Sequence, residues 1–242
     1  QRIMGLLNLE GVDTSLMPKG EGRTGFSIVL DAYKHDHTIL AFKGSNDELH
    51  LSEARLSKMK TKWFYFSSMM GRSYKTIEKL AVWAKKNNTR VMFNPSSYLC
   101  RKGKNYLAKL LRNCAILVLN KEEAEMLSQK KKVREMLKTL SRMGPELTII
   151  TDGKNGAYLH EKGFYRIKSR KVKVVETTGA GDAFGSSFLG AYIRTGDLEL
   201  SLKIGMVNAE SVIQHVGSKN KLLTWNEAIG LIKKYPNKVQ AL

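Results

Sequence analysis

The sequence predicts an α/β protein whose sheet is mainly parallel and is covered by helices on both faces. Two observations carry this prediction: segments typical of strand and helix alternate four times in the middle of the chain, and the strands are continuous apolar runs. Strands that are buried on both faces have this composition, and parallel neighbours are usually connected through helices. With 242 residues and 42% hydrophobic residues, the chain can bury one such core.

The alternation runs from residue 63 to residue 151. Apolar segments predict strands at residues 63–66, 90–93, 115–119 and 147–151. Apolar residues at helical spacing predict helices at residues 74–86, 106–111, 121–127 and 133–142. Turn-forming pairs, Asn94-Pro95 and Gly144-Pro145, separate these elements.

The two ends of the chain have a different pattern. Residues 26–30 and 38–42 read as two strands of a hairpin-like insert, and residues 157–159 and 164–167 as a second hairpin. Residues 1–10 read as the end of a helix. Beyond residue 182 we expect almost only helices, at residues 183–194, 198–216 and 225–234.

The net charge of +19, from 41 basic and 22 acidic residues, has two interpretations. It fits a nucleic-acid-binding protein, and it also fits a lysine-rich surface with a positive field for a polyphosphate substrate. The basic residues are spread along the chain, and the densest run, Lys130-Lys131-Lys132, contains no aromatic residue on which bases could stack. This distribution favours the second interpretation and disfavours nucleic acid as a partner.

The sequence contains no apolar run near the roughly 18 residues of a membrane span and no signal-peptide pattern at its start. Its cysteines, Cys100 and Cys114, form neither a CxxC pair nor a disulfide framework. We therefore expect a cytoplasmic protein with no membrane partner.

A glycine-containing loop stands out between residues 172 and 185. The β-rich segment 172–175 predicts a strand, and Glu176-Thr177-Thr178-Gly179-Ala180-Gly181-Asp182 leads from it into a long helix. Unpaired amides and the positive end of the dipole at a helix start favour an anion. Glycines allow that anion to approach the backbone closely.

Asp182 would lie in the first turn of this helix, and two roles are open for it. As a general base it would take a proton from an attacking hydroxyl, while the amides of Gly179, Ala180 and Gly181 form an anion hole for a phosphoryl group. Alternatively, Asp182 caps the helix and the glycines make a tight turn. The loop is neither a Walker motif nor a GxGxxG fingerprint.

The segment from Val175 to Phe184 resembles the C-terminal motif of the ribokinase-like, or PfkB, family of carbohydrate and nucleoside kinases. Other matches occur in the order in which that family has them, from about residue 11 to residue 225. They are Gly11-Val12-Asp13-Thr14, Thr24-Gly25, Gly44-Ser45-Asn46-Asp47, the NxxE motif Asn120-Lys121-Glu122-Glu123, Thr151-Asp152-Gly153-Lys154-Asn155-Gly156, Asn208 and Gly217-Ser218.

The resemblance implies a three-layer (α-β-α) ribokinase-like sandwich with a small β lid. The lid would comprise residues 11–46 and the nucleotide-binding and catalytic core residues 47–242. It also implies transfer of the γ-phosphate of a nucleotide, usually ATP, to a hydroxymethyl group of a sugar, sugar phosphate or nucleoside. Asp182 would be the base, and Gly179, Ala180 and Gly181 would form the anion hole.

The resemblance assigns further residues to the nucleotide and to Mg²⁺. Asn120 and Glu123 would organise Mg²⁺ through water, although the same spacing fits a helix cap with its reciprocal partner. Thr151 and Gly153 would contact phosphate or ribose, or else form an ordinary turn. Asn208 would approach the base or ribose, or else lie on an exposed helix face. Gly217 would line the nucleotide pocket.

Two departures from the family pattern affect these expectations. Many members have Asp where this chain has Glu176, at a position that helps to hold K⁺, so potassium activation is open; Thr178 and the Gly217 carbonyl are its other candidate ligands. Only ten residues precede Gly11, so we expect the first core strands to be absent and the native protein to be several dozen residues longer.

For the acceptor, the lid side offers Asp13, Thr24 and Asn46, and apolar lid strands predict a homodimer. The alternatives to a kinase are a non-catalytic nucleotide-binding module of the same fold and a basic nucleic-acid-binding protein.

Overall fold

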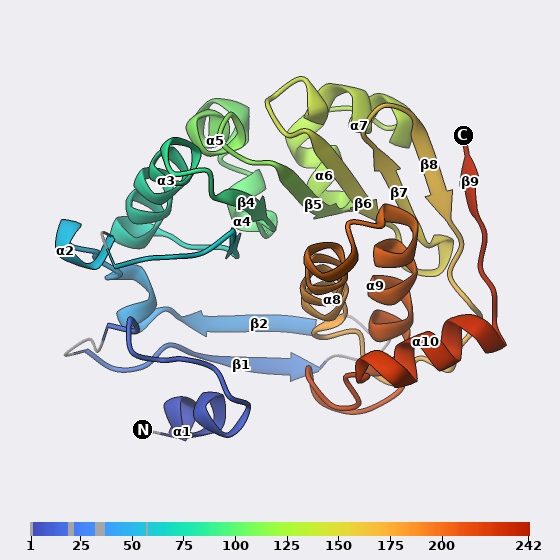
Figure 1. The fold of residues 1–242 in the computed structure, drawn as a ribbon, viewed down its shortest axis with the longest axis horizontal. Helices are drawn as coiled ribbons and strands as arrows, with labels where there is room; N and C mark the ends of the chain where they lie inside the picture. Colours follow the sequence, from blue (N-terminus) through green and yellow to red (C-terminus); the bar gives the residue numbers. More distant parts are fainter. Residues whose placement is uncertain (1, 19–21, 32–36, 57) are drawn as a thin grey trace. The chain divides into compact units, whose positions relative to one another are not determined.

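The computed structural model describes residues 2–18, 22–31, 37–56 and 58–242 (Figure 1). The chain divides into two compact units. The first comprises Gln1–Thr61 and Met69–Leu80, and the second comprises Lys62–Ser68 and Ala81–Leu242. Helix α3 (Gly71–Lys86) begins in the first unit and ends in the second.

A seven-stranded sheet with the order β3-β4-β5-β6-β7-β8-β9 forms the centre of the second unit. Its parallel strands are β3 (Trp63–Phe66), β4 (Arg90–Phe93), β5 (Ile116–Asn120) and β6 (Leu147–Thr151). Antiparallel pairing then adds β7 (Ala157–His160), β8 (Phe164–Ile167) and β9 (Val239–Ala241). Because β7 is antiparallel to β6 and β8 is antiparallel to β7, β8 runs in the same direction as β3 to β6. Five of the seven strands therefore share one direction, and the predicted mainly parallel sheet is confirmed.

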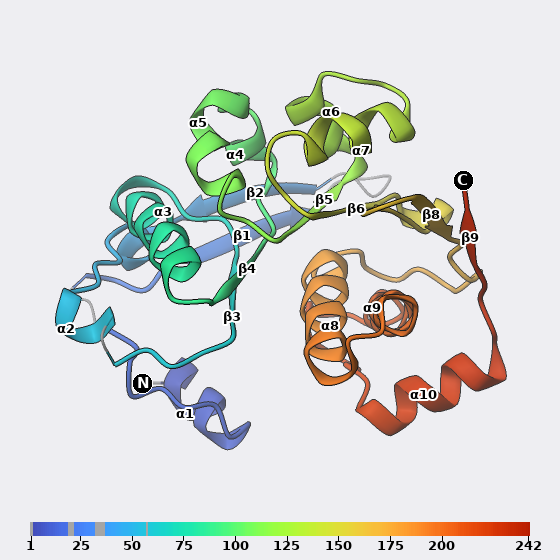
Figure 2. The same cartoon turned by 45° about the horizontal axis from the view of Figure 1, so that its top comes forward.

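Helices cover both faces of this sheet (Figure 2). On one face lie α4 (Ser97–Cys100), α5 (Gly103–Leu111), α6 (Lys121–Ser128) and α7 (Val133–Ser141). On the other lie α8 (Ala180–Thr195) and α9 (Leu198–Val212), and α10 (Trp225–Lys234) packs against this pair. Buried residues of α8, including Phe184 and Phe188, pack on Met92, Val118 and Ile149 of the sheet. The predicted three-layer sandwich is therefore confirmed.

The first unit contains α1 (Arg2–Leu9), the antiparallel pair β1 (Phe26–Asp31) and β2 (His37–Phe42), a 3-10 helix (Gly44–Asp47) and α2 (Glu53–Leu56). The predicted lid strands are thus present, whereas the segment expected to join them, residues 32–36, lies outside the described residues. Ser73 at the start of α3 fixes the chain after the lid, because its hydroxyl donates to the Asn46 carbonyl and accepts from the Leu49 amide.

The strand predicted at residues 172–175 is wrong. Residues 168–178, which we call the strap, have no regular secondary structure between β8 and α8. The strap bonds to α9 instead of a strand, since the Val175 amide donates to the Ile213 carbonyl at 2.8 Å. The free edge of β8 is occupied by β9, an element that the sequence patterns did not indicate. Helix α9 also ends at Val212, four residues earlier than predicted.

Cys100 and Cys114 are buried free thiols, and burial raises the pKa of each to about 12. Within the described ranges, none of the helices combines the length and the apolar content that a membrane span requires.

Candidate active site

The carboxyl ends of β5 and β6 meet at one edge of the sheet. Asn120 and Thr151, the last residues of these strands, are partners in the parallel register. Ligands of open α/β sheets usually bind beyond such strand ends. This edge therefore brings two of the predicted nucleotide-binding residues together.

Gly179 is the residue from which α8 starts. It has a positive φ of 85°, and a Cβ atom at this position would lie 2.2 Å from the Ser218 carbonyl oxygen. Both facts exclude an ordinary side chain, because L-residues rarely adopt this conformation and the space is filled by backbone. The approach to Ser218 fixes where the helix begins.

The amides of the first turn of α8 differ from the predicted anion hole in two respects. The Ala180 amide donates to the Thr177 carbonyl at 3.2 Å. Within the part of the chain that the structure describes, the amides of Gly181 and Asp182 have no such partner. The donors available to an anion thus include the amide of Asp182, which the sequence analysis did not assign.

Asp182 itself is exposed in this first turn. A carboxylate near a helix N-terminus is favoured by the dipole. The N-cap residue of α8 is Gly179, so Asp182 does not occupy the cap position that the alternative gave it.

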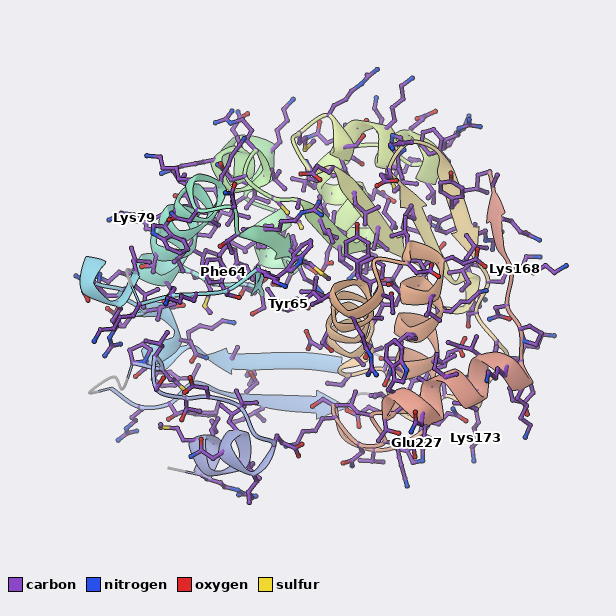
Figure 3. The ribbon with its side chains drawn as sticks, in the orientation of Figure 1. Phe64, Tyr65, Lys79, Lys168, Lys173 and Glu227 are labelled. Carbon is purple, nitrogen blue, oxygen red and sulfur yellow. The ribbon has the colours of Figure 1, made fainter. Side chains whose placement is uncertain are left out.

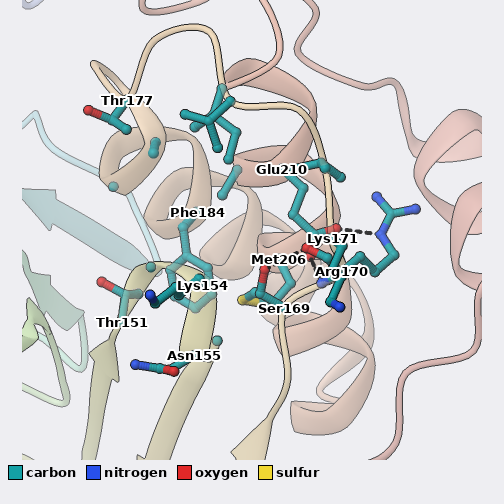
Figure 4. A pocket seen from close by; sticks show the side chains of 18 residues that line it. Thr151, Lys154, Asn155, Ser169, Arg170, Lys171, Thr177, Phe184, Met206 and Glu210 are labelled. Carbon is teal, nitrogen blue, oxygen red and sulfur yellow. Dashed lines mark hydrogen bonds and ion pairs between the residues drawn. The ribbon is translucent and has the colours of Figure 1, made fainter. Parts of the chain in front are cut away.

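A cavity of about 620 Å³ opens beside these elements (Figure 4). It brings together Thr151 and Gly153 at the end of β6 with Ala180 and Gly181 of α8. The other lining residues are Lys154, Asn155, Gly156, Ser169, Arg170, Lys171, Val172, Val174, Thr177, Phe184, Met206, Ala209, Glu210 and Ile213. A space of this size fits a small organic ligand.

The cavity is positively charged. Of its three cations, Arg170 is paired with Glu210, whereas neither Lys154 nor Lys171 has an ion-pair partner among the described residues. Two uncompensated ammonium groups and unpaired helix amides favour a polyanion such as a phosphate chain.

Asn120 and Glu123 form a reciprocal cap on α6. Asn120 Oδ1 accepts from the Glu123 amide at 2.8 Å, and Glu123 Oε2 accepts from the Asn120 amide at 3.0 Å. Glu123 is only 7% exposed, and burial raises the pKa of its carboxyl. The capping alternative is therefore present in the structure and engages Glu123 Oε2, whereas Oε1 accepts a long hydrogen bond from Ser97 Oγ at 3.4 Å.

Asn120 and Glu123 can be tested as Mg²⁺ ligands by the oxygen atoms that they offer. The described residues contain no group of three or more His, Cys, Asp and Glu side chains that could enclose a metal ion. Mg²⁺ usually retains several waters and takes one or two carboxylates plus phosphate oxygens. Glu123 Oε1 and Asn120 fit that water-mediated role and do not fit a dedicated cage.

Asn208 is buried, with 2% of its surface exposed, so the alternative of an exposed helix face is excluded. Its Oδ1 accepts from the Leu223 amide at 2.9 Å, and its Nδ2 donates to the Ile204 carbonyl at 3.2 Å. It does not line the cavity.

Glu176 and Gly217 are joined directly, because the Gly217 amide donates to Glu176 Oε2 at 2.8 Å. One carboxylate oxygen proposed for K⁺ thus already holds the loop after α9. Neither residue, nor the half-buried Thr178, lines the cavity.

The three acceptor candidates, Asp13, Thr24 and Asn46, are exposed residues of the first unit. The Ser15 amide donates to Asp13 Oδ1 at 2.8 Å, and this hydrogen bond lowers the pKa of the Asp13 carboxyl. Asn46 packs against Gly25, where a Cβ atom would lie 2.4 Å from its Nδ2.

Sequence reasoning missed Lys154, Lys171, Arg170 and Glu210 as cavity residues. Lys154 lies in the turn of residues 151–156 that resembles the family pattern, so its position in the sequence could have indicated that it lines the cavity. Glu210 had a weaker signal, as an acidic residue among apolar neighbours on a long predicted helix.

Residues 1–225 match the pfkB family of carbohydrate kinases. The chain belongs to this family. As a pfkB protein, it is a carbohydrate or nucleoside kinase. It is 29% identical over 219 residues to an uncharacterized sugar kinase of Archaeoglobus fulgidus, and the alignment covers 88% of this chain and 86% of the relative. It is 31% identical over 150 residues to a nucleoside kinase of Methanocaldococcus jannaschii, covering 61% of this chain and 49% of the relative.

The fold of this pfkB protein is also similar to solved structures. A crystal structure of the Methanocaldococcus jannaschii nucleoside kinase, described as an archaeal member of the ribokinase family, superposes with a TM-score of 0.80 at 23% identity. The match covers 97% of this chain and 76% of that one. The predicted membership of the ribokinase-like family is confirmed.

Proposed function

We propose that this kinase transfers the γ-phosphate of ATP to a hydroxymethyl group of a sugar, sugar phosphate or nucleoside, with Asp182 as the general base. One observation carries the proposal: the cavity joins the strand-end residues Thr151 and Gly153 to the first turn of α8, where the amides of Gly181 and Asp182 have no hydrogen-bond partner among the described residues. A nucleotide in this cavity would direct its phosphates to the helix N-terminus.

The phosphate chain is held by backbone and by lysine. The amides of Gly181 and Asp182 point toward an anion at the start of α8, and Lys154 and Lys171 supply charge along the cavity. Because these donors are fixed before the reaction, they stabilise charge on the moving phosphoryl group without reorganising. Gly179 and Ala180 set the backbone path that presents them.

Asp182 takes the proton of the acceptor hydroxyl as the hydroxyl oxygen attacks the γ-phosphorus. Its exposed carboxylate lies outside the cap position, which Gly179 occupies, and this supports a role toward a ligand. Asp13, Thr24 and Asn46 remain the candidates for holding the acceptor.

Asn120 and Glu123 are the residues that would hold the waters of Mg²⁺. When bound there, the ion would supply positive charge that offsets the charge of the phosphates. Thr178 and the Gly217 carbonyl remain candidate ligands of K⁺, with Glu176 positioning the Gly217 loop through its hydrogen bond. Asn208 acts on the nucleotide only through the loop that it holds at Leu223.

The test compares Asp182→Asn with the wild type. Nucleotide consumption with Mg²⁺ is followed across a panel of sugars, sugar phosphates and nucleosides, and nucleotide affinity is measured by calorimetry. We expect turnover on one acceptor class, a loss of at least about 100-fold in kcat in the variant, and unchanged nucleotide affinity.

Glu135→Gln is the matched control, because Glu135 is an exposed acid in the first turn of another helix, α7. It should retain wild-type turnover. If Asp182→Asn keeps wild-type kcat, the assignment of the base is wrong. Nucleotide binding without turnover on any acceptor would instead favour a non-catalytic nucleotide-binding module.

A further inference from the structure

The strap forms one wall of the cavity and is held against α9 near both of its ends. Arg170, Lys171, Val172 and Val174 of the strap line the cavity. Near its C-terminal end, the amides of Val175 and Glu176 donate to the Ile213 carbonyl at 2.8 and 3.2 Å. Lacking strand neighbours, the strap depends on such tertiary bonds for its position.

Near its N-terminal end, two side chains hold the strap: Asn237 Nδ2 donates to the Lys168 carbonyl at 2.9 Å, and Glu210 of α9 binds Arg170. Glu210 Oε1 accepts from the Arg170 backbone amide at 2.7 Å, and Oε2 accepts from Arg170 Nε at 2.5 Å (Figure 4). Only 2% of Glu210 is exposed, and the Arg170 guanidinium also lies over the Tyr235 ring, 5.2 Å from its centroid. The carboxylate therefore fixes both the backbone and the side chain of one strap residue.

Helix α9 supplies the opposite wall. Met206, Ala209 and Glu210 of α9 line the cavity together with Ile213, its C-cap residue, at a spacing that places them on one side of the helix. Glu210 and Ile213 are thus at once wall residues and the anchors of the strap. The width of the cavity between strap and helix is set by the bonds that these two residues make.

We propose that Glu210 is a positioning residue for the nucleotide donor: by clamping Arg170, it holds the strap at the distance from α9 that the bound nucleotide requires. This inference rests on the proposed function, because it takes the cavity as the nucleotide site. The strap includes Thr177 and leads directly into Gly179, so the same clamp steadies the approach to the loop that presents the phosphate-binding amides.

The physical basis is the cost of an unpaired buried charge. Removing one partner of a buried ion pair leaves the other without compensation, which is far more disruptive than losing an exposed pair. Without the carboxylate, the Arg170 amide and guanidinium must find other acceptors, and the strap moves to provide them. A small displacement in a positioning element is enough to weaken binding strongly.

The first experiment uses Glu210→Gln, which preserves the size of the side chain and removes its charge. We expect the dissociation constant and the KM for the nucleotide to rise about 10- to 100-fold, with the KM for the acceptor unchanged. Glu199→Gln is the matched control on the same helix, since Glu199 is an exposed carboxylate whose ion pair is with Lys203. It should leave both KM values unchanged.

A second variant separates positioning from stability. In the double variant Arg170→Met and Glu210→Met, apolar side chains of similar length replace the pair, a change that often preserves stability. Thermal unfolding near that of the wild type, combined with a raised KM for the nucleotide alone, would support the clamp. Wild-type nucleotide affinity in either variant, measured where circular dichroism shows a folded protein, would overturn it.

The same measurements distinguish this inference from the proposed function. If the wild type binds no nucleotide, the assignment of the cavity fails whatever Glu210 does. If the wild type binds nucleotide and the kinetic parameters of Glu210→Gln match those of Glu199→Gln, the clamp alone is refuted.

Discussion

At Gly179 the absence of a side chain decides where α8 can begin. Its φ of 85° and the Ser218 carbonyl, 2.2 Å from a would-be Cβ, both oppose any substitution. We expect Gly179→Ala to lower the free energy of unfolding by about 1–3 kcal/mol and to abolish most turnover, because the first-turn amides must shift. Thermal unfolding and kcat check both parts.

Gly190 provides the control on the same helix. It is exposed in the interior of α8, with nothing within 4 Å of an added Cβ. Gly190→Ala should therefore stabilise the protein, by about 0.5–1 kcal/mol, and leave kcat unchanged. Equal effects of the two substitutions would show that the start of α8 is not constrained as described.

The position of a single residue could be predicted where its neighbours in the sequence determine it. Asp182 follows a small-residue loop and precedes a long helix, so its place in a first turn could be inferred from the sequence alone. Glu210 could not be assigned, because its partner Arg170 is 40 positions away and no local pattern joins them. Asn208 was placed on the right helix, but its hydrogen bond from the Leu223 amide, in a loop beyond that helix, has no local sequence signal.

At the scale of elements, the lid pair β1-β2 carries an apolar face. Phe26, Ile28, Leu40 and Phe42 are each 46–57% exposed, and they are opposed in register as Phe26↔Phe42 and Ile28↔Leu40. We propose that this face pairs two copies of the chain, since apolar patches of this kind are commonly covered. We expect Ile28→Lys to convert a dimer into a monomer, as measured by sedimentation velocity at micromolar concentration.

Ser27→Lys is the control for this prediction. Ser27 is the neighbour of Ile28 on β1 and its side chain points to the opposite face. It should leave the dimer intact. A wild-type protein that sediments as a monomer would refute pairing through the lid.

The sequence indicated most elements and misassigned the strap for a physical reason. The strands β3 to β6 are continuous apolar runs, and their burial between helix layers follows from that composition. Residues 172–175 are β-rich as well, yet Val174 and Val175 are 52% and 42% exposed outside the sheet. Strand formation needs a free edge, and the edge beyond β8 was occupied by β9, whose three residues are too short for a periodic signal.

At the scale of the whole molecule, the charge of +19 is distributed over separate elements. Lys79 lies on α3, and Lys168 and Lys173 lie on the strap (Figure 3). Scattered charges neutralise few phosphates of a DNA duplex at once. We therefore expect weak DNA binding at 50 mM salt that is lost by 200 mM, checked by fluorescence anisotropy.

The outcome discriminates between the two interpretations of the charge. Binding that stays tight at 200 mM salt would favour a nucleic-acid partner. The salt dependence of the KM for the nucleotide can be compared with that of DNA binding. Nucleotide binding in a cavity with fixed donors should weaken less with salt than DNA binding to surface lysines.

The pairing of β9 with β8 has a practical consequence for anyone who handles this protein. Val239–Ala241 completes the sheet, and the Leu242 amide donates to the Phe164 carbonyl at 2.8 Å. Any residues that follow Leu242, those of a fused affinity tag included, would start against that strand, so a tag needs a flexible spacer before it. Trimming the same residues would uncover the amides and carbonyls of β8, the kind of bare strand that recruits other chains and ends in precipitate.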